Sequence, residues 1–436
     1  MIQTSRLPQG YKDSALEVIP KDWRVKKLGE VFLQLKNFSF SRDQMTDAYQ
    51  KLRYIHYGDI HVSLLKDSLN MQKDSLPFIF DGLITNEKLN NEDFPYLQNG
   101  DIILVDASED YEGIGKLWEI INTANKKIIS GLHTIPLRCF TNEVFVGFGR
   151  YVFKNPQSAI SLKKIAQGTK VYSISYNNIS KLSILLPPLP EQQKIAEILS
   201  LWYEAIEKQT QLIAQLETRK RGLMQQLLTG KKRLKGFSGE WKKVKIGEIG
   251  DVFSGGTPDT TNMSYWNGNI NWCTPTDISA LNEEKYIGNT ITKITQEGLN
   301  NSSAILLPKG SIIVCTRATI GKVVITNEDI STNQGFKNIV PNKKINTEFL
   351  YYSLLSLETT LLRLGNGSTF LEVSKKDFKN IQIFCPAFSE QTAIANILSI
   401  SDNELSLSKQ KLAGLKDQKK GLIQQLLTGK KRIKLL

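Results

Sequence analysis

The sequence predicts an α+β protein in which two globular α/β domains are separated by two long antiparallel coiled-coil helices, as an internal tandem repeat with pseudo-two-fold symmetry. Three observations predict this fold. A stretch of sixteen residues occurs twice with thirteen identities, weaker similarity extends from it over most of the chain, and a heptad pattern of apolar residues runs into each copy.

The repeated stretch reads KRGLMQQLLTGKKRLK at 220–235 and KKGLIQQLLTGKKRIK at 419–434, which is 199 positions later. At the same offset, EQQKIAEILS at 191–200 matches EQTAIANILS at 390–399. Further upstream, the tripeptide IGK recurs at an offset of 206, and a Trp followed by a K-L-G-E or K-I-G-E element recurs at an offset of 218. Each copy is therefore a variable globular part followed by a nearly fixed tail.

The tail of each copy predicts one long helix. Its apolar residues recur in alternating steps of four and three, which is the heptad pattern of a coiled-coil seam. Polar residues interrupt both seams at equivalent positions, Gln209 with Ser408 and Lys220 with Lys419. Each helix should run for about 39 residues, or about 58 Å, and the duplication favours antiparallel pairing. The seam comprises Ile195, Leu199, Trp202, Ile206, Ile213, Leu216, Leu223 and Leu227 in the first copy and Ile394, Leu398, Leu405, Leu412, Leu415, Leu422 and Leu426 in the second.

Composition argues against several classes of protein. No apolar run approaches the roughly 18 residues that span a bilayer, the start MIQTSRLPQGYKD lacks an apolar leader, and the four cysteines form no C-x-x-C pair. The sequence therefore predicts a cytoplasmic protein without a membrane partner or a metal site.

The net charge is +13, to which 216–235 and 416–434 contribute +6 each. Such basic clusters attract nucleic acid, but they also suit the C-terminal ends of helices.

These motifs also carry a resemblance to a known family. PPLPEQQKIAEIL at 187–199, then a long helix and QQLLTGKKR at 225–233, all repeated after a second variable domain, resembles the specificity subunit of type I restriction–modification systems. The resemblance covers the whole chain. SGGTP at 254–258 is a further family-like element, whereas the first variable domain has LQLKNFSF at 33–40 in that place. The second tail, CPAFSEQTAIANIL at 385–398, is a degraded form of the first.

The resemblance implies two target-recognition domains, at 1–187 and 236–386, and two conserved spacer helices, at 188–235 and 387–436. Such a chain is a non-catalytic subunit that reads a bipartite, asymmetric site in double-stranded DNA. The partners implied are two methyltransferase subunits and, in a restriction complex, translocase–endonuclease subunits. S-adenosylmethionine, ATP and Mg would then belong to the partners, and this chain would need no cofactor. The implied docking surface is the helix seam together with Glu191, Gln192, Glu390 and Gln391.

Motifs for catalysis by this chain are incomplete. FVGFG at 145–149 fits a methyl-donor loop, but no Asn/Asp-Pro-Pro-aromatic motif follows, so a turn before a helix is the competing interpretation. Neither IGK copy completes a phosphate-binding loop. The segment DISALNEEK at 277–285 fits a nuclease metal site only loosely. The three histidines, His56, His61 and His133, lack metal-ligand spacing. Two alternatives stay open: a repeat scaffold that assembles proteins without reading DNA, and the recognition subunit of a methylation-only system.

Candidate DNA contacts are polar side chains on predicted loops. Arg, Lys, Asn and Gln read base edges, whereas Lys, Arg, Ser, Thr and backbone N–H groups hold phosphates. For each candidate a structural role is the competing interpretation, such as an ion pair for Arg317 or a core position for Tyr54. The predicted contacts are Arg42, Arg53, Tyr54, His61, Lys116, Thr169 and Lys170 in the first domain and Gly256, Thr257, Arg317, Thr319, Lys322, Ser368 and Thr369 in the second.

Overall fold

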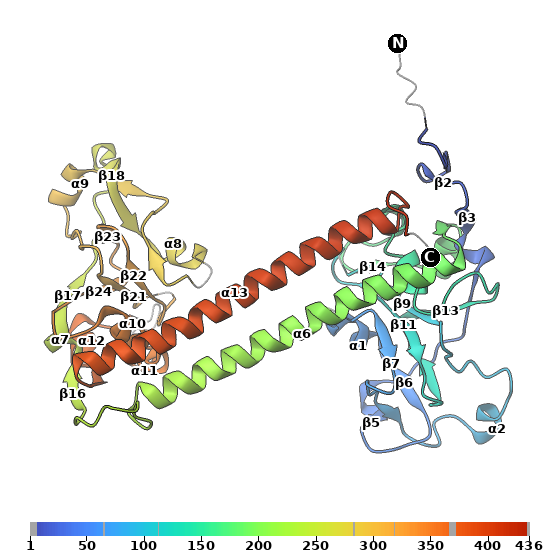
Figure 1. Cartoon of the computed structure of the whole chain (residues 1–436), viewed down its shortest axis with the longest axis horizontal. Helices are drawn as coiled ribbons and strands as arrows, with labels where there is room; N and C mark the ends of the chain where they lie inside the picture. Colours follow the sequence, from blue (N-terminus) through green and yellow to red (C-terminus); the bar gives the residue numbers. More distant parts are fainter. Residues whose placement is uncertain are drawn as a thin grey trace, which may run out of the picture. The chain divides into compact units, whose positions relative to one another are not determined.

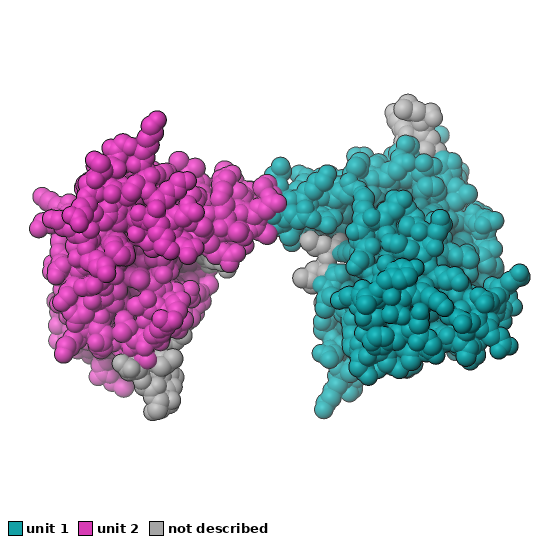
Figure 2. All heavy atoms as spheres, turned by 90° about the horizontal axis from the view of Figure 1, so that it is seen from below, with its two compact units in different colours: residues 1–211, 410–436 teal, residues 212–409 magenta. Residues whose placement is uncertain are grey.

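The computed structural model describes residues 7–63, 66–111, 113–281, 284–317, 319–365 and 372–433. They form two compact units (Figure 2). Unit 1 contains the chain up to residue 211 and again from residue 410, and unit 2 contains the chain between these points. Each unit therefore combines one globular head with the ends of two helices that belong to different copies of the repeat.

The head of unit 1 is built on a five-stranded and a four-stranded sheet (Figure 1). The larger sheet has the order β4-β13-β9-β11-β7 and is antiparallel except for the edge pair β7 and β11. Its central strand β9, with the sequence IILV, is buried on both faces, as a continuous apolar run predicts. The bounds are β4 (Phe32–Gln34), β13 (Thr134–Cys139), β9 (Ile102–Val105), β11 (Leu117–Asn122) and β7 (Ser68–Asn70), and in the smaller sheet β12 (Ile128–Ser130), β6 (Arg53–Ile55), β8 (Phe78–Ile79) and β5 (Met45–Thr46).

Short elements complete the head of unit 1. The helix α1 follows β6 directly, and the two-residue strands β10 and β14 pair with each other. Next to the helix tail, β3 and β15 form an antiparallel pair. The bounds are α1 (Tyr57–Val62), β10 (Ala107–Ser108), β14 (Tyr172–Ser173), α2 (Asn86–Leu89), α3 (Gly149–Val152), α4 (Pro156–Lys164), α5 (Tyr176–Ile179), β1 (Tyr11–Lys12), β2 (Ile19–Pro20), β3 (Arg24–Lys27) and β15 (Ser183–Leu186).

The head of unit 2 repeats the larger sheet with different residues, and its smaller sheet has three strands where that of unit 1 has four. Its five-stranded sheet has the order β17-β24-β21-β22-β19, again with one parallel pair at the β19 edge. The smaller sheet has the order β20-β18-β23, and β16 pairs with β25 next to the helix tail. The bounds are β16 (Lys242–Lys245), β17 (Gly250–Ser254), β18 (Trp266–Cys273), β19 (Tyr286–Ile287), β20 (Lys293–Ile294), β21 (Ile312–Cys315), β22 (Val323–Thr326), β23 (Ile330–Thr332), β24 (Phe336–Pro341), β25 (Gln382–Cys385), α7 (Ile246–Ile249), α8 (Pro275–Ala280), α9 (Gln296–Asn300), α10 (Thr347–Leu355), α11 (Glu358–Leu364) and α12 (Lys375–Asn380).

Two long helices, α6 (Leu189–Leu227) and α13 (Phe388–Leu426), each contain 39 residues. In unit 1 the start of α6 lies beside the end of α13, since Ile195 shares a hydrophobic core with Leu426. In unit 2 the end of α6 lies beside the start of α13, since Leu227 shares a core with Ile394. The predicted α+β class, tandem repeat and antiparallel helices are therefore confirmed. Every predicted seam residue is buried or half-buried.

The FVGFG segment lies around the buried carboxylate of Glu119. The N–H groups of Gly147 and Arg150 donate to Glu119, at 2.6 and 3.0 Å from its two carboxylate oxygens. The segment runs directly into α3, which is the turn that the sequence offered as the competing interpretation.

We expect Glu119 to make the stability of unit 1 depend on pH. Burial raises its pKa from 4.5 to about 7, against the opposing charge of Arg150. Because the folded pKa is the higher one, the stabilising proton is fully bound below about pH 4.5 and is lost as the pH rises through 7. Between about pH 4.5 and pH 7, the free energy of unfolding of the wild type should fall by about 3 kcal/mol relative to that of Glu119→Gln. Hydrogen exchange of the β9 amides, with the β21 amides as reference, measures the difference, and parallel pH profiles would contradict it.

Candidate nucleic-acid interface

In the first head, several predicted DNA contacts gather around α1. Nη2 of Arg42 lies 2.6 Å from Oδ1 of Asp59, which is on α1. Nε2 of His61 lies 2.9 Å from the carbonyl oxygen of Ala107, and Nζ of Lys116 donates to the carbonyl oxygen of His61 at 3.1 Å. We call Arg42, Asp59, His61 and Lys116 the α1 cluster.

Thr169 and Lys170 lie on an exposed turn in the same unit. The turn is closed by Ser173, whose N–H donates to the carbonyl oxygen of Gln167 at 2.7 Å. Its stem β14 pairs with β10, where Ser173 faces Ala107. Because Ala107 also contacts His61, the turn is anchored beside the α1 cluster.

Two further candidates of the first head have structural roles. Tyr54 is fully buried, and its hydroxyl donates to the carbonyl oxygen of Phe38 at 2.8 Å. Arg53 donates from Nη1 to the carbonyl oxygen of Leu76 at 2.7 Å, and its guanidinium lies 4.0 Å from the ring centroid of Phe78. Tyr54 is withdrawn from the surface, and Arg53 is half-buried against Phe78, so we leave both out of the proposed interface.

The hydrogen bond of Tyr54 locates the element that the first head has in place of SGGTP. In unit 2, Nε1 of Trp272 donates to the carbonyl oxygen of Gly256 at 2.9 Å, as Tyr54 does to Phe38. The N–H groups of Phe38 and Gly256 both donate to the last residue of the adjacent strand, Ser130 in β12 and Thr332 in β23, at 2.9 Å. The segment around Phe38 is therefore the structural counterpart of SGGTP.

The glycines of SGGTP are required by close backbone packing. A Cβ atom on Gly256 would lie 2.4 Å from the backbone nitrogen of Ala304, and one on Gly255 would lie 1.8 Å from the carbonyl oxygen of Asn333. Gly256 is buried and both of its backbone groups are bonded, so it is not open to a phosphate. Thr257 is half-buried, and its hydroxyl donates to Oε1 of Gln334.

The loop after β21 brings the remaining candidates of the second head together. Arg317 is half-buried and forms a backbone bridge with Glu372. The N–H of Thr319 donates to the carbonyl oxygen of Arg317 at 2.9 Å, and Lys322 is exposed. A Cβ atom on Gly335 would lie 3.9 Å from Cβ of Arg317, so Arg317 lies close to the segment that carries Gln334. Ser368 and Thr369 lie outside the described residues.

An aromatic group in the first head was missed by sequence reasoning. The ring centroid of Tyr57 lies 4.5 Å from that of His56, 5.4 Å from that of His133 and 6.0 Å from that of His61. Nδ1 of His133 lies 3.4 Å from Oδ1 of Asp106. All three histidines of the chain thus surround one ring, a signal that a search for metal-ligand spacing does not detect. Within the described ranges, no set of three His, Cys, Asp or Glu residues could hold a metal ion.

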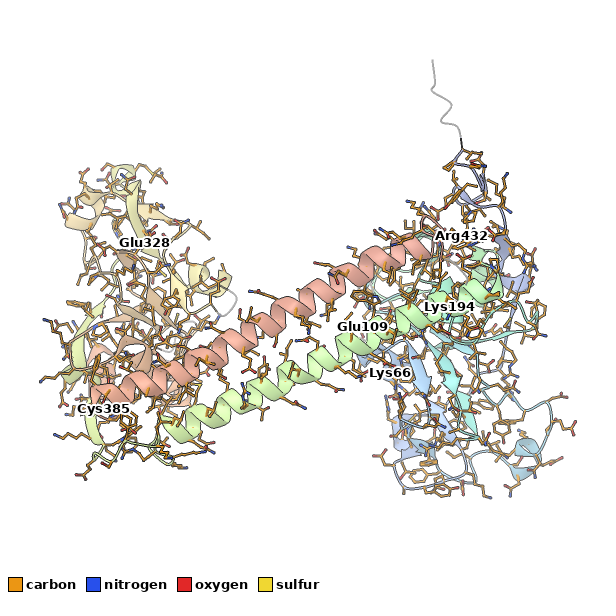
Figure 3. The ribbon with its side chains drawn as sticks, in the orientation of Figure 1. Lys66, Glu109, Lys194, Glu328, Cys385 and Arg432 are labelled. Atoms are coloured by element: carbon orange, nitrogen blue, oxygen red, sulfur yellow. The ribbon has the colours of Figure 1, made fainter. Side chains whose placement is uncertain are left out.

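The Glu-Gln pairs at the starts of the two helices have the same structural role in each unit. Glu191 is 1% exposed and accepts hydrogen bonds from Trp23 at 2.9 Å and from Arg432 at 2.8 and 2.9 Å. Glu390 is 2% exposed and accepts from Trp241 at 3.1 Å and from Arg233 at 2.7 and 2.8 Å. Figure 3 shows Arg432 beyond the end of α13, near the start of α6.

Each glutamine next to these carboxylates bonds backbone groups of its own head. Gln192 donates to the carbonyl oxygen of Pro187 at 2.8 Å, and Gln391 donates to that of Pro386 at 3.0 Å. Both glutamines are 1% exposed. The Glu-Gln pairs are therefore buried where each head meets the helices, and their side chains bond to residues of their own unit.

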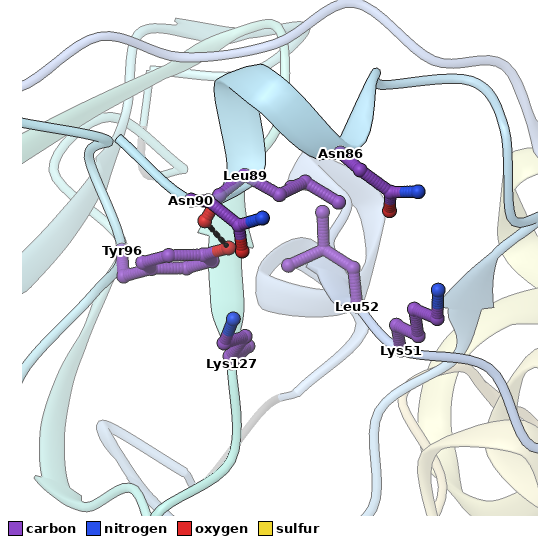
Figure 4. Close-up of a pocket in the computed structure, with 7 residues that line it drawn as sticks. All are labelled: Lys51, Leu52, Asn86, Leu89, Asn90, Tyr96 and Lys127. Atoms are coloured by element: carbon purple, nitrogen blue, oxygen red, sulfur yellow. Dashed lines mark hydrogen bonds between the residues drawn. The ribbon is translucent and has the colours of Figure 1, made fainter. Parts of the chain in front are cut away.

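A cavity of about 400 Å³ also opens in the first head, beside α2 (Figure 4). The hydroxyl of Tyr96 donates to the carbonyl oxygen of Leu89 at 2.9 Å, and Nζ of Lys127 lies 5.0 Å from the ring centroid of Tyr96. None of the predicted DNA contacts lines this cavity.

Among the described residues, none of the helices has the length and the apolar composition that crossing a membrane requires.

Comparison with known proteins gives consistent results over both copies of the repeat. The type I restriction modification DNA specificity domain matches residues 20–218 and 238–417. The putative type I restriction enzyme MjaX specificity subunit of Methanocaldococcus jannaschii is 26% identical over 439 residues, which covers 98% of this chain and 97% of that protein. The MjaIX specificity subunit of the same organism is 37% identical over 172 residues, which covers 39% of this chain and 40% of that protein.

Solved structures share the fold. The S subunit of a type I restriction–modification system from M. genitalium aligns with a TM-score of 0.55 at 16% identity, over 95% of this chain and 97% of that chain. A chain from a structure of type I R-M system assembly aligns with a TM-score of 0.58 at 18% identity, over 94% and 99%. Since the family match includes both heads and most of both helices, this chain belongs to the family of type I restriction–modification DNA specificity subunits.

Proposed function

We propose that this chain is the sequence-recognition subunit of a type I restriction–modification complex and reads a bipartite, asymmetric site in double-stranded DNA. The observation that carries the proposal is that two heads whose five-stranded sheets share one strand order present different polar groups on their loops. The first head offers the α1 cluster, and the second offers Thr257, Arg317 and Gln334. Different side chains on one scaffold are what the reading of two different half-sites requires.

The helices serve as spacer and docking element in this proposal. Two methyltransferase subunits bind to the surface that α6, α13 and the Glu-Gln junctions shape, and translocase–endonuclease subunits join in a restriction complex. The partners hold S-adenosylmethionine, ATP and Mg, and this chain contributes no catalytic step. The target adenine must leave the base stack for methylation, which is work for the methyltransferase.

Single-molecule methylation sequencing tests the proposal. DNA is taken from cells that express this chain with its neighbouring methyltransferase, and from cells that lack the chain. A split adenine motif that depends on the chain would support the proposal. The absence of any motif, with the assembled complex demonstrated, would overturn it in favour of a scaffold that assembles proteins without reading DNA.

We expect the isolated subunit to bind DNA weakly at physiological salt. The two basic stretches carry 12 of the 13 excess charges, so the heads are close to neutral and few phosphates can be neutralised. Salt titration of binding, with and without the methyltransferase, measures the difference as a steeper slope for the complex. Nanomolar binding by the subunit alone at 150 mM salt, about the physiological ionic strength, would contradict this expectation.

A further inference from the structure

A cleft of about 260 Å³ lies in unit 1 where the head meets α6 and α13. Four of the residues that line it are lysines, namely Lys66, Lys116, Lys154 and Lys419. Figure 3 shows Lys66 on the side of the head that is next to α6. Asp67 is the one carboxylate among the described lining residues. Lys66 is paired with Asp74, at 2.8 Å, so the positive surplus of the cleft comes from the other three lysines.

Asp67 cannot neutralise this group of lysines, because two cations already share it. Nζ of Lys154 contacts its Oδ2, and Nε of Arg150 lies 3.5 Å from its Oδ1. Lys419 forms no ion pair within the described part of the chain, and its Nζ lies 3.6 Å from the ring centroid of Tyr203. Three cations, Arg150, Lys154 and Lys419, therefore face two carboxylates at this junction, Asp67 and the buried Glu119.

At the equivalent junction of unit 2, the positive and negative side chains are equal in number. Lys220 stands at the position that corresponds to Lys419, and its Nζ lies 2.5 Å from Oδ1 of Asp402. Asp402 stands at the position that corresponds to Tyr203 in the cleft of unit 1. Nζ of Lys285 lies 3.3 Å from Oε1 of Glu348. Two cations thus face two carboxylates, and the charge surplus is a property of unit 1 alone.

The ammonium group of Lys419 lies at a buried position, where a positive charge is disfavoured. Burial, with the nearby charge of Lys154, lowers the pKa of Lys419 to about 8. An apolar residue at this seam position would pack without that cost, since a buried charge is stabilising only when it is paired. The contact with the ring of Tyr203 holds Lys419 between the two helices but does not neutralise its charge, whereas an anion in the cleft would.

We propose that this cleft binds one backbone phosphate of the DNA next to the half-site that the first head reads, an inference that rests on the proposed function. Lys116 connects the cleft to the α1 cluster, because its Nζ donates to the carbonyl oxygen of His61. A phosphodiester in the cleft would thus lie beside the predicted base contacts. Lysine ammonium groups bind phosphate as point charges, and a phosphate contact of this kind fixes the register of the head on the duplex.

The test uses the complex of the full chain with its methyltransferase and a duplex that carries the methylated motif. The variants are Lys419→Met and, as the matched control from the other copy of the repeat, Lys220→Met. For Lys419→Met we expect the slope of log K against log salt to fall by about 0.9, the value for one lost phosphate contact. The Lys220→Met slope should equal that of the wild type.

Thermal unfolding of the same chains in inorganic phosphate, against chloride at equal ionic strength, gives a second readout. Phosphate should raise the unfolding temperature of the wild type and of Lys220→Met, but not that of Lys419→Met. If Lys419→Met fails to fold, Lys66→Met replaces it with the same expected slope, because Lys66 lines the cleft but lies outside the α1 cluster. Stabilisation by phosphate with an unchanged slope would overturn the DNA assignment in favour of a free-phosphate site.

An unchanged slope without any phosphate effect would overturn the inference entirely. This failure is distinct from failure of the proposed function, because the duplex in the test exists only if a chain-dependent methylation motif has been found. Equal slope changes in Lys419→Met and Lys220→Met would also overturn it, since they would assign the effect to the general charge of the helices.

Discussion

Glu191→Ala is expected to lower the free energy of unfolding of unit 1 by about 2–4 kcal/mol, because the variant leaves buried donors without an acceptor. Glu191 accepts from the indole N–H of Trp23, which is fully buried, and from two nitrogens of Arg432. Arg432 is 37% exposed and also pairs with Asp22, so part of its charge stays compensated. The loss should therefore fall below that of a fully buried ion pair.

Urea unfolding of the full chain measures this loss when hydrogen exchange is monitored at the β9 amides for unit 1 and at the β21 amides for unit 2. Glu197→Ala is the matched control, because Glu197 is exposed on the same helix and, among the described residues, pairs only with its neighbours Lys194 and Gln193. The control should change stability by less than about 0.5 kcal/mol. A loss confined to unit 2, or equal losses for the two variants, would contradict the assigned role of Glu191.

Replacing residues 236–383 by the corresponding segment of a relative is expected to change one half of the methylated motif and leave the other half intact. The exchanged segment carries the second head, including Thr257, Arg317 and Gln334. The ion pair between Arg233 and Glu390 lies outside it and continues to close the junction with the helices. The new half of the motif should match one half of the motif of the donor protein.

Methylation sequencing of cells that express the chimera measures the outcome. The unchanged half of the motif serves as an internal control for folding and for assembly with the methyltransferase. Changes in both halves would contradict independent reading by two heads. If the methyltransferase methylates the original motif when it is assembled with the chimera, recognition would lie outside the exchanged segment.

The long-range architecture could be predicted from the sequence because the seam has a strict pattern. Leu199 and Leu398 are fully buried, and each lies in the core of its own unit, as the heptad spacing requires. The repeat at an offset of 199 positions also favoured antiparallel pairing of the two helices. These features depend on periodicity and self-similarity, which one sequence displays directly.

Individual contacts could not be predicted, because their roles depend on neighbours that are distant in the sequence. Tyr54 and Arg53 have the chemistry of DNA contacts, but the fold places their polar atoms on carbonyl groups of Phe38 and Leu76. Gly256 has the backbone freedom of a phosphate loop, but Ala304 lies directly against it. Polar chemistry on a loop is therefore insufficient to identify a contact without the surrounding structure.

The position of the end of α13 has a consequence for synthesis on the ribosome. The core of unit 1 contains Leu426 and Leu427, and Asn155, buried in the first head, donates to the carbonyl oxygen of Leu427 at 2.6 Å. The first head to be translated thus cannot complete its core until nearly the last codons have been read. A nascent chain must carry this unfinished apolar surface throughout elongation. A premature stop near the 3′ end of the gene would damage the domain that its 5′ end encodes.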